Sequence, residues 1–122
     1  MINNNFEKKL KSKEFVFTAE TSPPDSTVRS EITDRVLCLK DLADAINVTD
    51  GASAKSHLSS LVVSSIIKDI EIEPILQLTT RDRNRIAIQS DLLGAWTLKI
   101  QNILCIYGDQ VETGDQPDTK EV

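Results

Sequence analysis

The chain has 122 residues, enough for one domain with a hydrophobic core. Its 19 acidic and 14 basic residues give a formal net charge of −5, which argues against a general nucleic-acid-binding surface. No run approaches the about 18 apolar residues of a membrane-spanning helix, and the first residues lack the apolar core of a signal peptide. We therefore expect a cytoplasmic protein that binds neither nucleic acid nor a membrane.

The first part of the chain alternates between apolar runs and amphipathic segments. Residues 1–13 predict a short helix with solvent-exposed lysines, and FVFTAE at 15–20 predicts a strand that the following prolines terminate. A helix is expected at about 27–44, because apolar residues recur there at helical spacing. Its predicted inward face consists of Val28, Ile32, Val36, Leu39 and Ala43.

The same alternation continues along the rest of the chain. In order, the predicted elements are a strand at 45–49, a helix at about 54–69, a strand at 74–78, a helix at 84–98 and a strand at 102–107. The predicted inward residues of the two helices are Leu58, Leu61, Val62, Ser65 and Ile66, then Ile88, Leu92, Ala95 and Trp96. The single histidine, His57, has no other ligand-type residue at metal-binding spacing, so we interpret it as a surface or helix-end residue.

The two cysteines, Cys38 and Cys105, are far apart, and neither belongs to a CxxC pair. Cys105 lies inside the apolar run NILCIY, which predicts a buried side chain of small size. The sequence also lacks a metal-ligand cluster, a nucleophile elbow and a P-loop. These absences argue against the metalloenzyme, serine hydrolase and P-loop classes.

The predicted strands begin near positions 15, 45, 74 and 102, so the intervals are 30, 29 and 28 residues, the size of a βα unit. Continuous apolar strands joined by amphipathic helices indicate a parallel sheet in an α/β fold. A closed (β/α)8 barrel needs eight units, about 250 residues, whereas this chain supplies three units and a fourth strand. The residues alone leave two alternatives open, part of a barrel or an open four-stranded sheet. A receiver-like domain is disfavoured, because it needs a fifth strand and a late lysine.

Each predicted strand closes on polar side chains, namely Glu20, Thr49 with Asp50, Gln77 with Thr79, and Asp109. Because parallel strands share one direction, these side chains should gather on one rim, where α/β folds place their chemistry. The last fourteen residues carry five acids and one lysine without apolar periodicity. We interpret residues 110–122 as an acidic, flexible tail.

The segment QLTTRDRNRIAIQSDLLGA, followed by YGD, resembles the flavin-dependent methylenetetrahydrofolate reductases, in particular the branch with a DRNR and QSDLLGA helix. The resemblance runs from FVFTAETSPP to GDQPD, which is nearly all of this chain but only about two-fifths of a family member. It favours the barrel alternative. It implies that residues 1–122 form the amino-terminal part of a TIM (β/α)8 barrel, with three βα units plus a fourth parallel strand.

The resemblance also implies an activity for the complete enzyme. NAD(P)H would pass a hydride through a flavin, FAD or alternatively FMN, to 5,10-methylenetetrahydrofolate and give 5-methyltetrahydrofolate. The implied partners are the folate substrate and the nicotinamide, with either a homo-oligomer or the missing barrel half completing the site. The alternative is a truncated, non-catalytic relative that needs a partner to supply the rest of the barrel.

Two carboxylates are the catalytic and substrate-binding candidates that the resemblance implies. Glu20, in the E-x-x-P-P segment, corresponds to the general acid that protonates a folate nitrogen as the five-membered ring opens. Asp109, in the Gly-Asp pair, corresponds to the carboxylate beside flavin and folate that stabilises the iminium cation. The structural alternatives are a solvated strand-end glutamate and a turn aspartate.

The flavin contacts implied by the resemblance come from three strand ends. The turn TDGA at 49–52 resembles the family's T-Y-G-A turn, with Asp50 where some members have tyrosine, and Gln77 stands where others have histidine. Tyr107 replaces an arginine or threonine before the Gly-Asp pair. The candidate cofactor-binding residues are Thr49, Asp50, Ala52, Gln77, Tyr107, Gly108 and Asp109.

Several charged residues precede the third helix, and they are Arg81, Asp82, Arg83 and Arg85. A phosphate site at this helix start is one interpretation. We favour structural salt bridges with acids such as Asp91.

Overall fold

The computed structural model of the chain describes residues 4–122 and contains one parallel sheet with the strand order β1-β2-β3-β4. The strands are β1 (Thr18–Thr21), β2 (Ala45–Val48), β3 (Pro74–Thr79) and β4 (Asn102–Ile106). Each strand pairs in parallel with its neighbour in sequence, so all four carboxyl ends lie at the same edge of the sheet.

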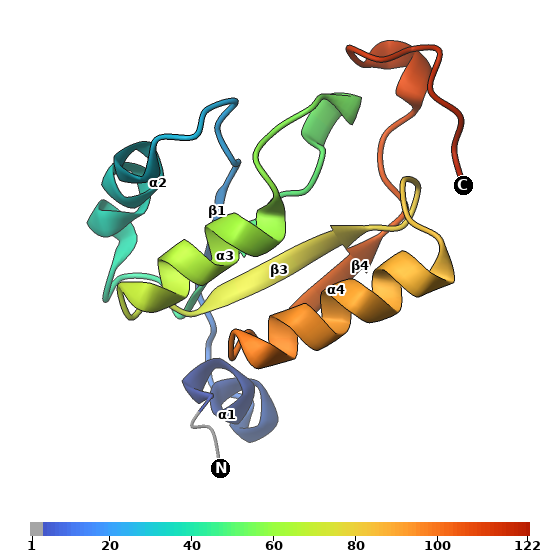
Figure 1. The fold of residues 1–122 in the computed structure, drawn as a ribbon. Coiled ribbons are helices and arrows are strands. Elements are labelled where there is room, and N and C mark those ends of the chain that lie inside the picture. The colour runs from blue at the N-terminus through green and yellow to red at the C-terminus, as the bar shows by residue number, and fades with distance from the viewer. Residues whose placement is uncertain (1–3) are drawn as a thin grey trace.

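Helices connect the strands and cover one side of the sheet. They are α1 (Asn5–Ser12), α2 (Arg29–Val36), α3 (Ser60–Asp69) and α4 (Arg85–Thr97), with 3-10 turns η1 (Leu37–Leu39), η2 (Ala52–Ala54) and η3 (Val111–Thr113). Figure 1 shows α2, α3 and α4 on the same side of the sheet, and α1 beyond the end where the strands begin. This arrangement confirms the predicted α/β fold and is consistent with part of a TIM barrel.

The core lies between the sheet and its covering helices. Alternate residues of the two central strands point into it, and Ile46, Val48, Leu76 and Leu78 are almost completely buried. Each such side chain contributes about 1.5–3 kcal/mol by leaving water. The opposite side of the sheet forms a hollow of about 780 Å³, with Glu20, Asn47, Ile75, Asn102 and Leu104 in its wall and α1 at its base.

The amino-terminal helix is fastened beneath this hollow. The Nζ of Lys9 lies 2.5 Å from Oδ1 of Asp44, and the other carboxylate oxygen of Asp44 accepts the backbone N–H of Phe17. The hydrogen bond from Lys9 holds the pKa of Asp44 below its usual value. Helix α1 begins at Asn5, and residues 1–3 of the predicted helix lie outside the described residues.

The first strand is shorter than predicted at its start. The prediction began at Phe15, but β1 begins at Thr18 because β2 offers partners only from Ala45 onward. Phe15 is 87% exposed and Phe17 is 55% exposed, so neither belongs to the core.

The predicted helix at 27–44 is also too long. Helix α2 ends at Val36, η1 continues it as a tighter turn, and Asp41 adopts a positive φ of 65° that reverses the chain. Ile32 and Val36 are buried as predicted, whereas Val28 is 48% exposed.

The predicted helix at 54–69 begins only at Ser60. Residue 58 bonds instead to the preceding connection, since the N–H of Leu58 donates to the carbonyl of Pro24. His57 therefore lies in an irregular segment and not on a helix. Val63 and Ile67 are buried in place of Val62, which is 45% exposed.

The predicted apolar stripe on α4 is only partly buried. Ala95 is fully buried, and a Cβ at Gly94 would lie 3.5 Å from Leu61 of α3, so these residues define the covered side of the helix. Leu92 is 37% exposed and Trp96 is 64% exposed. The predicted burial of Cys105 is wrong for a related reason, because β4 is an edge strand and its cysteine is exposed.

The segment after β4 packs back onto the sheet edge, which its interpretation as a flexible tail missed. Val111 is buried, and a Cβ at Gly114 would lie 1.9 Å from the carbonyl oxygen of Ala54. The N–H of Val122 donates to the carbonyl of Arg81. Figure 1 shows this segment at the end of the sheet opposite α1.

Within residues 4–122, no helix is both long enough and apolar enough to cross a membrane.

The exposed thiol of Cys105 gives a direct test of the open β4 edge. In a Cys38→Ser variant, we expect the remaining thiol to react with a disulfide reagent in native buffer as fast as in denaturant, because Cys105 is exposed. A Cys105→Ser variant, which keeps the exposed Cys38, is the matched control. Protection of Cys105 until denaturant is added would contradict the open edge and would show that β4 is covered in solution.

Candidate functional site at the carboxyl ends of the strands

A hollow of about 350 Å³ lies at the edge where the strands end. Its lining residues are Glu20, Thr49, Asp50, Gly51, Ala52, Gln77, Ile106, Gly108 and Asp109. All four strands or the turns after them contribute to it. The structure thus brings together every candidate site residue from the sequence except Tyr107.

Glu20 lies on the sheet face opposite the helices, between this hollow and the larger one. Its register partner in β2 is Asn47, and the Nδ2 of Asn47 donates a hydrogen bond of 3.0 Å to Oε2 of Glu20. The carboxylate is therefore exposed but held by the neighbouring strand.

Thr49 is 6% exposed, and its hydroxyl donates to Oγ of Ser22 at 3.0 Å. This bond joins the ends of β1 and β2. The hydroxyl of Thr49 therefore has a structural partner at this edge of the sheet.

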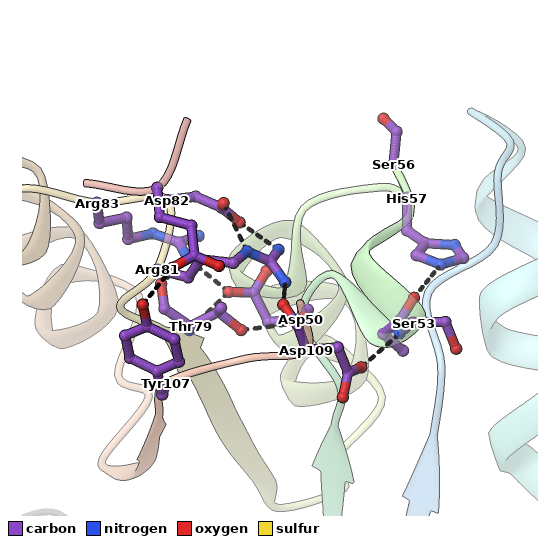
Figure 2. Close-up of polar contacts among 12 residues, drawn as sticks. Asp50, Ser53, Ser56, His57, Thr79, Arg81, Asp82, Arg83, Tyr107 and Asp109 are labelled. Atoms are coloured by element: carbon purple, nitrogen blue, oxygen red, sulfur yellow. Dashed lines mark hydrogen bonds and ion pairs between the residues drawn. The ribbon is translucent and has the colours of Figure 1, made fainter. Parts of the chain in front are cut away.

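Asp50 fastens the end of β2 to the end of β3. Its carboxylate Oδ2 accepts the N–H of Thr79 at 2.9 Å and Nη1 of Arg83 at 2.6 Å, while its own N–H donates to Oε1 of Gln77 at 3.0 Å. Its carbonyl accepts the hydroxyl of Thr79 at 2.8 Å. Figure 2 shows Asp50 beside two of these partners, Thr79 and Arg83. Asp50 therefore joins the ends of β2 and β3 through its side chain and its backbone.

Arg83 forms the ion pair with Asp50. Besides Asp50, its guanidinium binds Oδ2 of Asp91 at 2.8 Å and the carbonyl of Thr79 at 2.8 Å. Burial lowers the pKa of Arg83, but the bonds to Asp50 and Asp91 outweigh it, so the pKa lies above the ordinary value. The salt-bridge interpretation of this segment is confirmed. The ion pair between Asp50 and Arg83 was not predicted from the sequence. The presence of an aspartate in the TDGA turn and of several arginines before the third helix could have suggested it.

Arg81 holds the backbone that follows β4. It is 4% exposed, its Nε and Nη2 bind both oxygens of Asp82, and its Nη1 donates to the carbonyl of Asp109 at 2.6 Å. Gly108 has φ of 111°, and a Cβ there would lie 2.5 Å from Cγ2 of Thr79. Only glycine fits between Arg81, Thr79 and the hollow at this position.

Asp109 presents its carboxylate at the rim. Its Oδ2 accepts the N–H of Ser53 at 2.8 Å, in a turn where Ser53 and Ala54 both adopt positive φ. Together with the Arg81 bond to its carbonyl, this contact fixes the backbone and the side chain of Asp109 (Figure 2).

Tyr107 does not line the hollow. Its side chain is 60% exposed and its hydroxyl donates to the carboxylate of Glu121 in the segment after β4. This hydrogen bond and the negative charge of Glu121 raise the pKa of Tyr107 above its usual value. The alternation of β4 explains the orientation, because Ile106 is the residue that faces the hollow.

Comparison with protein families gives one clear result, since the profile described as methylenetetrahydrofolate reductase matches residues 5–122. The chain belongs to the methylenetetrahydrofolate reductase family. It is thus a member of an oxidoreductase family whose fold is a TIM barrel, and the resemblance found in the sequence is confirmed. A comparison with individual curated proteins gave no match.

For a methylenetetrahydrofolate reductase family member, the charge of the rim is informative. Glu20, Asp50 and Asp109 line the hollow, and no lysine or arginine does so among residues 4–122. Asp50 is paired with Arg83, which leaves Glu20 and Asp109 as the carboxylates of the hollow without an ion-pair partner among the described residues. Within the described chain, no group of three or more His, Cys, Asp or Glu residues is placed to hold a metal. This rim suits a ligand that develops positive charge.

The tie between Asp50 and Arg83 should be among the strongest polar contributions to stability. Asp50 is 12% exposed and Arg83 is 20% exposed, so Arg83→Met leaves a nearly buried carboxylate unpaired. We expect the free energy of unfolding to fall by about 2–4 kcal/mol, measured by urea titration. The control is Arg29→Met, which breaks the Arg29–Asp69 pair, both 60% exposed, and should cost under about 1 kcal/mol. Equal losses in the two variants would contradict the role of Arg83.

The bond between Tyr107 and Glu121 predicts a pH dependence. Since the raised pKa belongs to the folded state, this bond stabilises fully below the unfolded-state pKa and is lost as pH rises through the folded-state pKa. Tyr107 is the single tyrosine, so an absorbance titration reports it alone. We expect Glu121→Gln to lower the titration midpoint, whereas Asp118→Asn, with the same change of charge, should move it less. Identical midpoints in wild type and Glu121→Gln would show that the bond does not form in solution.

Proposed function

We propose that the complete enzyme reduces 5,10-methylenetetrahydrofolate to 5-methyltetrahydrofolate, with NAD(P)H as the electron donor and a flavin as the carrier. Family membership supports the proposal. The observation that carries it is the pair of carboxylates, Glu20 and Asp109, held at one rim by separate hydrogen bonds.

The residues at the rim fit the ring system of a flavin, FAD or FMN. Ala52 and Gly108 present little side-chain bulk, and Gln77 lies between them with an amide that can hydrogen-bond a ring edge. No cation lines this hollow among the described residues, so its chemistry suits the uncharged ring better than the phosphate groups. When bound, the flavin would accept hydride from the nicotinamide and deliver it to the folate.

Glu20 would act as the general acid. As the five-membered ring of the folate opens, its carboxyl group gives a proton to the leaving nitrogen, and the carbon left behind becomes an iminium cation. The carboxylate of Asp109 would stabilise this cation, because a fixed carboxylate costs no reorganisation when charge develops. The hydrogen bonds from Arg81 and Ser53 to Asp109 keep its carboxylate in place for that role.

The other wall of the site would come from outside the described sheet. Strands β1 and β4 have free edges within residues 4–122, and the sheet face that carries Glu20 is open. An eight-stranded barrel closes both edges and surrounds such a face with further strands. Further βα units, or a second copy of the chain, would supply them. A relative that lacks them would be non-catalytic until such a partner binds.

Substitution of Glu20 separates the two halves of the proposed reaction. In the complete enzyme, Glu20→Gln keeps the shape and hydrogen-bonding capacity of the side chain but removes its proton. We expect folate reduction to slow by about 10²–10⁴-fold, the usual cost of losing a general acid. Flavin reduction by NAD(P)H should stay within a few-fold, because it delivers no proton to the folate.

Stopped-flow absorbance of the flavin follows each half-reaction separately. Equal losses in both would mean that Glu20 maintains the site and is not its acid. The matched control is Glu31→Gln, an exposed glutamate of α2 that should leave both rates unchanged.

A further inference from the structure

One polar atom beside the candidate acid lacks a partner. Oδ1 of Asn47 is buried and has no hydrogen bond within the described chain, although Nδ2 of the same amide donates to Glu20. Buried side-chain oxygens nearly always accept a hydrogen bond, and leaving one unsatisfied costs about 1–3 kcal/mol. The unpaired oxygen therefore calls for an explanation.

The position of Asn47 makes it the natural partner of Glu20. It lies at the centre of β2, with Glu20 beside it on β1 and Ile75 beside it on β3, and all three line the larger hollow. Among residues 4–122, its amide supplies the one hydrogen bond made to the carboxylate of Glu20.

Among residues 4–122, the charged residues that line the two hollows with Glu20 are all acidic. Glu7 of α1 shares the larger hollow with it, and Asp50 and Asp109 share the smaller one. Glu7 pairs with Lys11, Asp50 pairs with Arg83 and Asp109 accepts the N–H of Ser53. None of these groups can donate a proton to Glu20 or hold it through an ion pair, so the task of orienting it falls to the neutral amide of Asn47.

An amide suits a neighbour that changes its protonation state. The NH₂ of asparagine donates to an ionised carboxylate, and its carbonyl oxygen accepts from a protonated carboxyl group. The final torsion of asparagine is broad and roughly two-fold, so half a turn exchanges the two ends of the amide. A lysine could serve only the ionised state, and an ionised aspartate could serve only the protonated state.

We propose that Asn47 is a positioning residue that holds Glu20 in both protonation states, with Nδ2 donating to the carboxylate and Oδ1 accepting from the carboxyl group. In the proposed reaction, on which this role rests, the proton of Glu20 passes to the folate nitrogen as the carbon–nitrogen bond breaks. The carboxylate that remains is then bound by the amide until water reprotonates it. The unpaired Oδ1 is the acceptor for the other half of this cycle.

Nuclear magnetic resonance of the 122-residue chain tests the exchange without any turnover. We expect the side-chain amide signals of Asn47 to shift with pH at the same midpoint as the carboxyl carbon of Glu20, and we expect this shift to vanish in Glu20→Gln. Amide signals of Asn47 that do not follow the titration of Glu20 would overturn the proposal. Because no folate or flavin is present, this result is separate from the success or failure of the proposed reaction.

Two variants of similar size test the need for both ends of the amide. Asn47→Leu removes donor and acceptor, so the side chain of Glu20 should become as mobile as that of the exposed Glu31 at every pH. Asn47→Asp can share a proton with Glu20, so Glu20 should stay ordered at low pH and become mobile only when both groups are ionised. Carbon relaxation of the glutamate methylenes measures this mobility, and thermal melting checks that each variant is folded. An ordered Glu20 in Asn47→Leu would contradict the proposal, and the wild-type titration decides it if that variant does not fold.

Discussion

The partly buried ion pair between Asp50 and Arg83 is the constraint on which the rim of the sheet depends. It joins the turn after β2 to the turn after β3, and the same two residues bind the backbone of Thr79 from opposite sides. This ion pair therefore fixes the position of the end of β2 relative to the end of β3. Glu20 and Asp109, which come from the outer strands, face a hollow whose floor this pair has fixed. In this chain, Arg83 of the DRNR segment thus pairs with the aspartate of the TDGA turn.

Periodicity in the sequence was enough to predict every strand and every principal helix, because parallel strands buried by helices leave an unmistakable pattern of apolar runs. It failed at the ends of elements. Pattern alone could not show that Asp41 reverses the chain after α2, or that Leu58 bonds to Pro24 and delays α3 until Ser60. Both outcomes are decided by tertiary hydrogen bonds and positive φ angles. Cys105 was misplaced because an apolar residue at an edge strand looks the same in sequence as one at a central strand. Trp96 was misplaced because periodicity alone did not show that the covered side of α4 is set by Ala95 and Gly94.

The sequence predicted which candidate residues lie together, with the exception of Tyr107, whereas their functional roles stay predictions. The rule that parallel strand ends share an edge placed Glu20, Gln77 and Asp109 together correctly. Side-chain partners need coordinates, so neither the bond from Asn47 to Glu20 nor the contact of Tyr107 with Glu121 could be read from the chain. Strand alternation argues against Tyr107 as a residue of the hollow, because its neighbour Ile106 faces the hollow and successive side chains point to opposite sides.

Strand order that matches chain order has a consequence for how such a protein can be made. Within residues 4–122, each strand of this sheet pairs with the strands that neighbour it along the chain, and the bonded residues Glu20 and Asn47 are 27 positions apart. Pairing between successive βα units closes smaller loops than pairing between strands that lie far apart in the chain would. The sheet can thus grow by accretion as the polypeptide leaves the ribosome, each βα unit adding to a finished edge. In this order the candidate acid and its amide meet while Asp109 has still to be translated, so one of the two rim carboxylates is set in place before the other exists.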